Sequence, residues 1–476
     1  MQRLEILTLV LDHQNFFQNS PDIIQRNIPV SQWLDGHEIN FIYGPPHTGK
    51  TSLLKQAADI VQGMKVYVDF EDSRFNELKP EDFSKIKEIA IEGYRTGHED
   101  KELENEEKHD EKNTGSVYYF LDNIQNVSGW EDWIDSLQRE GAHIFITSST
   151  LPMNQETSSR FANRIKIHRL LPFSFKEYLT LKGLRVPRPN FLTPSRCDDM
   201  LCLFLRYFEN GGFPEIIKTE DYRLSRKYFE EILQEIIARY NIRDPQGIKK
   251  LAVFLISNMA SEYSVDTLRK MSGIDSEDTI RDYLDYLEGA SLISRTRMFN
   301  YTSEKPENEK ENEKENRTEE GIEKGTEEGI EKGIENKKAN KEDIPCKVYA
   351  ADTSFFKSVF PNYPDSLGLR FENLVFLELL RQGKEVSYFR DGRECNFLIT
   401  EDDNCSVTAA VQVSICFGSP AIKEREIIGL VAAMEKYGLN DGLILTMDDE
   451  GVMEIANEDG EEKKITIKQV WKWMLE

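Results

Sequence analysis

The chain contains few cysteines, and they are scattered. None of them forms a CxxC pair, and no histidine stands nearby to complete a metal-binding motif. This disfavours the common paired-cysteine metal and redox motifs. We therefore expect buried free thiols, as is typical of a protein from a reducing cytoplasm. The six cysteines are Cys197, Cys202, Cys346, Cys395, Cys405 and Cys416.

Positive charge and long apolar runs are also scarce. Lysine and arginine number 60 against 85 aspartates and glutamates, which gives a formal net charge of −25. This charge disfavours broad binding to DNA or anionic membranes, although a local basic patch is compatible with it. No segment approaches the roughly 18 uninterrupted apolar residues of a membrane span. The opening apolar stretch is broken by Asp12 and His13 and is a poor signal peptide. We predict a cytoplasmic protein with no membrane partner.

Two acidic segments carry almost no apolar residues. They are residues 97–115 and 303–343, and the second repeats EEGIEKG at 319–325 and 327–333. Such segments bury too little apolar area to offset the loss of chain entropy. We expect both to be solvated inserts, and an acidic interaction tail is the alternative.

Apolar strands alternate with helical patterns between residues 30 and 180. The strands read NFIYG, KVYVDF, VYYFLD and AHIFITS and are apolar on both faces, which predicts a parallel sheet covered by helices on both sides. Residues 195–300 are helical in period, and residues 345–476 return to a mixed pattern. We predict an α/β protein of two to four domains.

The first apolar strand runs into GPPHTGKT at residues 44–51, which fits the phosphate-loop pattern G-x-x-x-x-G-K-[ST]. An amphipathic helix follows, so backbone N–H groups and the helix N-terminus would surround a phosphate group. Lys50 would bridge the β- and γ-phosphates of ATP, and Thr51 would bind Mg²⁺. His47 stands at a variable loop position and is more often incidental than catalytic. The predicted ATP-binding residues are Gly44, Pro45, His47, Thr48, Gly49, Lys50, Thr51 and Ser52.

Polar residues end two further apolar strands. VYYFLD ends at Asp122, which is predicted to hold Mg²⁺ through a water together with Thr51. AHIFITSST ends in hydroxyl residues, and Thr147 or Ser148 would contact the γ-phosphate or the attacking water. These strands and the phosphate loop, in this order, predict a P-loop core with ATP and Mg²⁺ as cofactors.

This series of motifs resembles AAA+ ATPases of bacteria and archaea that carry a C-terminal domain of unknown function. The motifs are GPPHTGKT (44–51), VDFEDSR (68–74), FLDNIQNVSGWEDW (120–133), FITSST (145–150), NRIKIHRLLPFSFKEYL (163–179) and GGFPE (211–215). The resemblance implies a winged-helix middle domain and a C-terminal domain with the PD-(D/E)xK nuclease, or restriction-endonuclease-like, fold. The predicted domains are residues 1–185, 186–302, 303–343 as the acidic insert, and 344–476.

The chain departs from this family at the end of the Asp122 strand. The family places a Glu after the Asp, and this chain has Asn123, while Ser148 replaces a Gly. Asparagine cannot accept a proton but still binds water, so slow hydrolysis would survive through positioning. Glu71 and Asp72 are candidates for a substitute carboxylate. The alternative is that they cap the next helix or bind Arg74.

Arg164 stands where the family has the arginine of a GR pair. The resemblance implies contact with a γ-phosphate, in cis or from a neighbouring subunit, and a structural salt bridge is the alternative. The predicted catalytic residues are Asp122, Asn123 and Arg164. GGFPE is expected to be a turn with packing demands rather than a chemical site.

The middle domain has helix–turn–helix spacing at residues 264–301. Its second helix, SEDTIRDYLDYLEG, carries five acidic residues against one base, Arg281, and would repel phosphates. A lid or a protein-contact role is therefore favoured. Arg295 and Arg297 keep DNA reading open as the alternative.

The C-terminal domain lacks most of the charged residues that the nuclease chemistry needs. Glu372 remains, whereas the resemblance aligns Asn396, Gln412 and Ser414 with the expected Asp, Glu and Lys. Clustered carboxylates hold Mg²⁺ in such enzymes, so we expect a nuclease-like fold without nuclease activity. A displaced metal site using Asp391 and Glu394 is the alternative.

The leading hypothesis is an ATP-binding AAA+ protein with slow or conditional hydrolysis that acts as a nucleotide-controlled switch or scaffold. The second is a DNA-processing ATPase with a working nuclease, which a basic groove or bound metal near Asn396 and Gln412 would favour. The third is an interaction protein independent of nucleotide, which a phosphate loop closed by its own side chains would favour.

Overall fold

A computed structural model describes most of the chain outside the acidic inserts. The described residues are 1–19, 25–34, 36, 38–102 (backbone alone from 93), 116–151, 160–161, 163–299, 345–359, 367–401, 406–456 and 462–476. The predicted insert 303–343 and residues 103–115 of the other insert lie outside them. Among the helices in these ranges, none combines the length and apolarity that a bilayer crossing requires.

The N-terminal domain contains a parallel sheet, as predicted, and it has a fifth strand beyond the four that the sequence indicated. Its strand order is β2-β3-β4-β1-β5, and each neighbouring pair is parallel. The phosphate loop and Asp122 both follow strands of this sheet, so they meet at its carboxyl edge. The strands are β1 (Ile39–Tyr43), β2 (Met64–Asp69), β3 (Val117–Asp122), β4 (His143–Ser148) and β5 (Ile165–Arg169).

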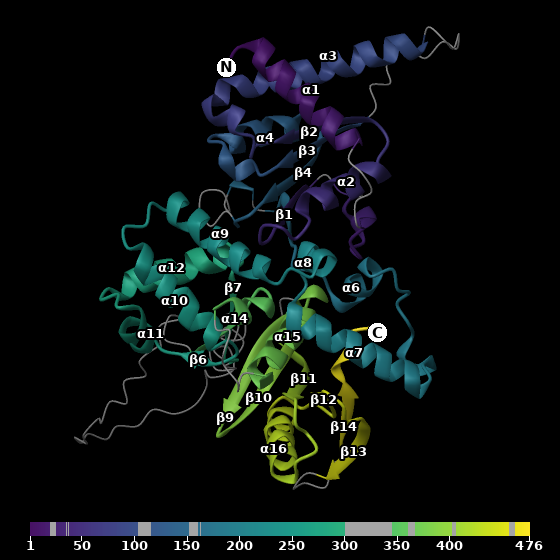
Figure 1. Ribbon diagram of the computed structural model, residues 1–476, viewed down its shortest axis with the longest axis vertical. Coiled ribbons are helices and arrows are strands. Elements are labelled where there is room, and N and C mark those ends of the chain that lie inside the picture. The colour runs from purple at the N-terminus through teal and green to yellow at the C-terminus, as the bar shows by residue number, and fades with distance from the viewer. Residues whose placement is uncertain are drawn as a thin grey trace, which may run out of the picture.

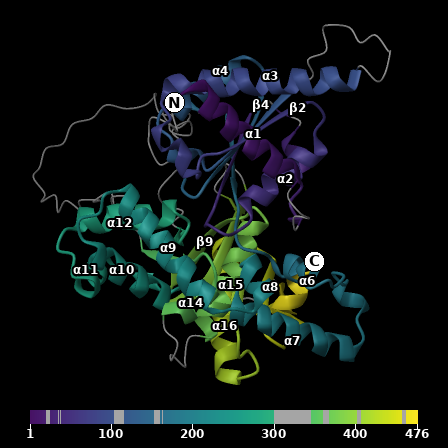
Figure 2. The same ribbon diagram turned by 45° about the horizontal axis from the view of Figure 1, so that its top comes forward.

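Helices cover both faces of this sheet (Figures 1 and 2). On one face, α1 (Arg3–Asn19), α3 (Phe83–Glu102) and α4 (Trp130–Arg139) bury a common core. On the other face, α2 (Lys50–Ile60) packs Leu53 and Leu54 against the strands. This explains why the strands are apolar on both sides. Short 3₁₀ turns occur at Val30–Trp33, Ser73–Glu77, Pro80–Asp82, Ile124–Asn126 and Pro189–Phe191.

The middle of the chain is mostly helical and includes a small antiparallel sheet of order β6-β8-β7. The strand β8 follows the acidic insert in sequence, yet it pairs with both β6 and β7. The predicted domain boundary at residue 344 therefore falls between two strands of one sheet. The helices are α6 (Phe175–Leu181), α7 (Pro194–Asn210), α8 (Pro214–Thr219), α9 (Arg223–Arg239), α10 (Pro245–Ser257), α11 (Val265–Ser272) and α12 (Glu277–Gly289), and the strands are β6 (Glu262–Tyr263), β7 (Ile293–Arg297) and β8 (Cys346–Ala350).

The C-terminal part is a mixed six-stranded sheet of order β13-β14-β12-β11-β10-β9. The pairs β11–β12 and β12–β14 are parallel, and the others are antiparallel. Helices α15 and α16 contribute to separate cores with the sheet. The elements are β9 (Glu385–Asp391), β10 (Arg393–Glu401), β11 (Ser406–Ser414), β12 (Asp441–Thr446), β13 (Gly451–Ala456), β14 (Glu462–Gln469), α14 (Ser354–Val359), α15 (Leu367–Arg381), α16 (Pro420–Lys436) and α17 (Val470–Trp473).

The GGFPE motif lies where the three parts of the chain meet. The N–H of Gly212 donates to Asp352 Oδ2 at 2.8 Å, and its carbonyl accepts from the N–H of Phe173 at 2.7 Å. A Cβ on Gly212 would stand 2.3 Å from the carbonyl oxygen of Phe173. The second glycine is therefore needed for close backbone approach. This geometry supports the packing role that we predicted for the motif.

All five cysteines in the described residues are free thiols, as expected, and Cys405 lies outside them. Cys395 is buried. However, Cys197 and Cys346 are only half-buried, and Cys202 and Cys416 are exposed, so the expectation of burial is wrong for the last two. Both belong to surface segments, where a free thiol has no structural reason to be covered.

Candidate nucleotide-binding site

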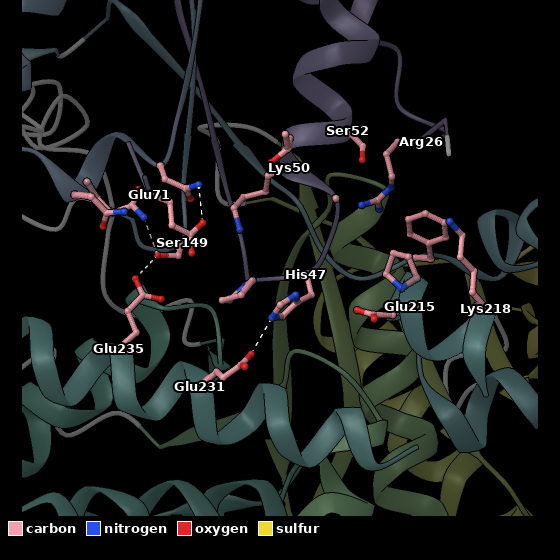
Figure 3. A pocket seen from close by; sticks show the side chains of 18 residues that line it. Arg26, His47, Lys50, Ser52, Glu71, Ser149, Glu215, Lys218, Glu231 and Glu235 are labelled. Carbon is pink, nitrogen blue, oxygen red and sulfur yellow. Dashed lines mark hydrogen bonds and ion pairs between the residues drawn. The ribbon is translucent and has the colours of Figure 1, made fainter. Parts of the chain in front are cut away.

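A cleft of about 910 Å³ opens between the phosphate loop and helices α8 and α9 (Figure 3). Its N-terminal side includes Lys50, Thr51, Glu71 and Asn123. Its other side is formed by residues of the middle helices, namely Pro214, Glu215, Lys218, Glu231 and Glu235. The cleft is therefore bounded by two parts of the chain that the sequence separates widely.

The phosphate loop has the backbone that its glycines allow. Gly49 takes a left-handed conformation with φ of 88° immediately before α2, which an L-residue adopts only with strain. The Lys50 ammonium donates to the carbonyls of Gly44 and Pro45 at 3.0 Å each. Burial lowers the pKa of Lys50 to about 8, although the Asp122 and Glu235 carboxylates oppose this. Lys50 and Thr51 both line the cleft, so the loop is not closed off by its own side chains.

The predicted Mg²⁺ ligands Thr51 and Asp122 lie together. Thr51 Oγ1 donates to Asp122 Oδ2 at 2.6 Å. The same carboxylate, which is 1% exposed, also accepts from the Tyr67 hydroxyl at 3.1 Å and from the Thr147 hydroxyl. Burial raises the pKa of Asp122, with a further contribution from the charge of Asp69. Hydroxyl and carboxylate oxygens suit Mg²⁺, so these residues fit a hydrated Mg²⁺ ion.

Asn123 is held in a left-handed conformation with φ of 54°. Its N–H donates to Thr147 Oγ1 at 3.0 Å. Its side-chain amide donates to Asp69 Oδ1 at 3.1 Å and to Glu71 Oε2 at 3.2 Å. The residue that replaces the expected glutamate therefore binds two carboxylates from the end of β2.

Glu71 and Asp72, the two candidate substitute carboxylates, have different surroundings. Glu71 lines the cleft. Asp72 instead accepts hydrogen bonds from the N–H and guanidinium of Arg74 and lies 3.1 Å from the His13 ring. These contacts hold the pKa of Asp72 below its usual range. The capping and Arg74-binding alternative thus describes Asp72 and does not describe Glu71.

The end of β4 contributes a different hydroxyl from those predicted. Thr147 binds Asp122, and Ser148 Oγ donates to the Thr150 carbonyl at 2.6 Å. Ser149 instead lines the cleft, accepts from Gln125 at 3.1 Å and donates to Glu235 of α9. The FITSST motif pointed to this segment, but not to which of its hydroxyls faces the cleft.

Five of the eight predicted ATP-binding residues line the cleft, namely His47, Gly49, Lys50, Thr51 and Ser52. Thr48 is fully buried and donates to the carbonyl of Pro45 at 2.9 Å. His47, with φ of 64°, points to α9, where its Nε2 lies 2.9 Å from Glu231 Oε2 and its ring stacks on Tyr228 at 4.0 Å. His47 therefore joins the phosphate loop to the middle helices (Figure 3). Gly44, Pro45 and Thr48 shape the loop from behind.

Arg26 is the main residue that the sequence pattern missed. It is 5% exposed and lines the cleft. Its guanidinium donates to Glu177 Oε1 at 2.6 Å, to the Thr48 carbonyl at 2.7 Å and to the Leu171 carbonyl at 3.0 Å. Glu177 also completes a capping box with Ser174 at the start of α6. The S-x-x-E spacing in FSFKEYL was the one readable sign of this arrangement.

Arg164 lies outside the cleft. Its guanidinium pairs with Asp135 Oδ1 and Gln138 Oε1, each at 2.9 Å. Its carbonyl accepts from the N–H of Ile39 at the start of β1, so the length of β1, more than about 13 Å, separates it from the phosphate loop. The predicted contact in cis is therefore wrong for this arrangement, and Arg164 makes the structural salt bridge. A contact from a neighbouring subunit stays a prediction.

The C-terminal residues named by the resemblance gather in a second cleft, of about 510 Å³. Asn396 Nδ2 donates to Glu372 Oε2 at 2.8 Å, and the N–H of Asn396 donates to Gln412 Oε1 at 3.1 Å. Ser414 lines the same cleft. The three arginines in the lining are matched by three glutamates, so the cleft is not basic; they are Arg390, Arg393, Arg425, Glu372, Glu394 and Glu426.

A lysine that the sequence pattern did not indicate lies against these carboxylates. The Lys347 ammonium, 2% exposed, lies 2.9 Å from Glu372 Oε1 and 2.5 Å from Glu394 Oε1. Asp391 is exposed and 3.8 Å from Lys436. Across the part of the chain that the structure describes, no group of three or more His, Cys, Asp and Glu side chains is arranged to hold a metal. The displaced metal site is therefore not formed.

The acidic helix α12 contacts the N-terminal domain. The N–H of Leu151 donates to the Gly289 carbonyl at 2.9 Å. Arg295, one of the two arginines on which the DNA-reading alternative rests, lies 2.6 Å from both Asp285 and Glu288. Its charge is thus balanced within the domain.

Comparison with known proteins supports the N-terminal assignment. Residues 36–179 match a family described as AAA domain, and residues 202–315 match one described as a domain of unknown function (DUF8612). The N-terminal part of the chain is therefore an AAA-type ATPase domain of P-loop fold. The first match contains the phosphate loop, Asp122 and Glu177.

Two relatives are similar over most of their length. Uncharacterized protein MJ1544 of Methanocaldococcus jannaschii is 26% identical over 474 residues, covering 95% of this chain and 91% of the relative. An uncharacterized protein of Haemophilus influenzae is 26% identical over 391 residues, covering 78% and 82%. Among solved structures, the Thermotoga maritima RuvB Holliday junction branch migration motor overlaps 62% of this chain and 90% of its own, at 17% identity and a TM-score of 0.21. A TM-score this low means that the two structures superpose poorly, so this similarity does not bear on function.

Proposed function

We propose that this protein binds ATP with Mg²⁺ in the cleft between the phosphate loop and helices α8 and α9. The observation that carries the proposal is the 2.6 Å contact of Thr51 with Asp122 beside Lys50, at the edge of an open cleft. Backbone N–H groups of the loop and the Lys50 ammonium would bind the β- and γ-phosphates. Mg²⁺ would be held by Thr51 and, through water, by Asp122.

Bound nucleotide would control the contact between the N-terminal domain and the middle helices. Two contacts now join them at the cleft, from His47 to Glu231 and from Ser149 to Glu235. A triphosphate brings negative charge close to both glutamates, and like charges repel in a partly buried cleft. Nucleotide occupancy is therefore expected to change how α9 lies against the phosphate loop. We propose this change as the switch, with slow or conditional hydrolysis resetting it.

Calorimetry with MgATP tests the binding assignment. Lys50→Ala removes a charge-assisted contact worth about 1.5–3 kcal/mol, so affinity should fall by about 10- to 100-fold. Lys250→Ala is the matched control, because Lys250 is an exposed lysine on α10. Unchanged ATP affinity in Lys50→Ala would refute the assignment.

For the C-terminal part we propose a nuclease-like fold without nuclease activity, beside a winged-helix middle domain that contacts protein rather than DNA. Support for the first comes from Lys347, whose ammonium pairs with both Glu372 and Glu394, and from the balanced charge of the cleft. Support for the second comes from the element order α10-β6-α11-α12-β7-β8 and the acidic face of α12. DNA cleavage with Mg²⁺ or Mn²⁺ that disappears in Glu372→Ala would instead establish the DNA-processing alternative.

A further inference from the structure

The amide of Asn123 connects the Glu71 carboxylate, which lines the ATP cleft, with that of Asp69 at the end of β2. It donates to Asp69 at 3.1 Å and to Glu71 at 3.2 Å, while the Asn123 N–H is fixed by Thr147 at 3.0 Å. A glutamate at position 123 could donate no such hydrogen bond. It would also add a fourth carboxylate to Asp69, Glu71 and Asp122, which already repel one another. Asparagine therefore suits position 123, because it donates to the acidic residues at and just after the end of β2.

Of the described acidic residues that line the cleft, Glu71 is the one from the N-terminal domain, next to Asn123. Glu231 binds His47, Glu235 binds Ser149 and Arg239, and Glu215 accepts from Tyr228 at 2.6 Å. The Glu71 carboxylate has the Asn123 amide as its hydrogen-bond partner among the described residues. It also lines the cleft close enough to Lys50 for their charges to interact.

We propose that Glu71 accepts the proton of the attacking water during ATP hydrolysis and that Asn123 positions its carboxylate. The water oxygen forms a bond to the γ-phosphorus, and the bond from that phosphorus to the β–γ bridging oxygen breaks. The electron pair leaves with ADP, and the water proton moves to Glu71. The proposal rests on the proposed ATP site and names the group that performs its chemistry.

The electrostatics of Glu71 suit this role. Burial, with contributions from Asp69, Asp122 and Glu235, raises the pKa of Glu71, and Lys50 opposes the shift. A raised pKa makes the carboxylate a better proton acceptor. The hydrogen bond from Asn123 favours the ionised form.

Steady-state MgATP hydrolysis and MgATP calorimetry on the full chain test this assignment together. Glu71→Gln should lower kcat by about 10²- to 10⁴-fold and leave ATP affinity within about threefold of wild type. Glu81→Gln, which removes the same charge from an exposed residue, should change neither. Asn123→Glu should not raise kcat, because Glu71 already serves as the base.

The pH profile separates positioning from mere packing. In the pH profile of kcat, the pKa of the acid limb should lie above the usual range of a glutamate, and this limb should disappear in Glu71→Gln. In Asn123→Ala it should move to higher pH, since the carboxylate loses a donor.

Turnover of Glu71→Gln within threefold of wild type, or wild-type protein that binds MgATP without turnover, would overturn the proposal and leave the ATP site standing. Wild-type protein that does not bind MgATP would overturn the proposed function itself.

Discussion

The buried ion pair of Arg26 and Glu177 predicts a large effect of a single substitution. The Arg26 and Glu177 side chains are 3% and 5% exposed, and Arg26 binds the Thr48 carbonyl of the phosphate loop. Arg26→Met would leave Glu177 as a buried charge without its cation, a change that costs about 3–5 kcal/mol. The backbone N–H groups of Ser174 and Asn27 still donate to Glu177, at 2.8 and 3.0 Å. We therefore expect the lower end, about 3 kcal/mol.

The effect should depend on pH in a defined direction. Burial alone would raise the pKa of Glu177, but the Arg26 charge and hydrogen bonds outweigh it and hold that pKa below the usual range. In the wild type the pair's contribution is therefore present above the unfolded pKa of Glu177 and is lost as pH falls through the lower folded value. In Arg26→Met the Arg26 charge and hydrogen bonds are lost and only the backbone donors Ser174 and Asn27 still oppose burial, so the pKa of Glu177 rises and it protonates more readily. The destabilisation should be greatest near pH 8 and smaller near pH 5.

Urea-dependent hydrogen exchange of peptides from α2 and α6 measures the opening free energy of this region. Arg74→Met is the matched control, because Arg74 pairs with Asp12 and Asp72 through a side chain that is about half exposed, and solvent screening makes such pairs contribute little. The double variant Arg26→Met with Glu177→Leu should recover most of the stability. It should not recover ATP affinity, because the Thr48 carbonyl has lost its anchor. An Arg26→Met effect no larger than that of Arg74→Met would refute the reasoning.

Two further substitutions test contacts elsewhere. His47→Ala removes the stacking on Tyr228 and the contact with Glu231, which together contribute about 1 kcal/mol, so hydrogen exchange in α9 should rise several-fold, and unchanged exchange would show that the contact does not hold α9. Lys347→Met leaves Glu372 buried without its cation and should cost about 3–5 kcal/mol in urea unfolding of the C-terminal part. Because burial raises the pKa of Glu372, that cost should shrink near pH 5, and an equal cost at pH 5 and pH 8 would contradict this account.

The parts of the fold that the sequence predicted are those whose signals are local. The parallel sheet, the phosphate loop and the Thr51–Asp122 pair follow from short apolar runs that end in particular polar residues. Strand β8 was predicted apart from its partners β6 and β7, because the acidic insert stands between β7 and β8 and hides their pairing. A hairpin is readable only when its turn is short.

The missed residues depend on partners that are distant in sequence. Arg26 and Glu177 are 151 positions apart. The S-x-x-E pattern indicates the helix cap of Glu177 but does not indicate its pairing with Arg26. Lys347 acquires its role from Glu372 and Glu394, which lie on α15 and β10. The predicted contact of Arg164 with the phosphate in cis was wrong for the opposite reason. A motif placed it near the phosphate, but its position at the start of β5 put it at the far edge of the sheet.

The carboxylate sites at Asp122 and Glu372 differ in the source of their cation, and metal removal should have different effects on the two. Asp122 has hydroxyl partners, and its partner Thr51 lines an open cleft, so a cation must be supplied from solution together with the nucleotide. Glu372 already has the Lys347 ammonium at 2.9 Å, and a metal ion would have to displace a buried charge. EDTA should therefore lower ATP affinity, by at least about tenfold, or 1.4 kcal/mol. Hydrogen exchange in α15 should be the same with EDTA and with Mn²⁺. Increased protection of α15 on adding Mn²⁺ to the wild type would mean that a metal binds at Glu372 after all, and would restore the nuclease hypothesis.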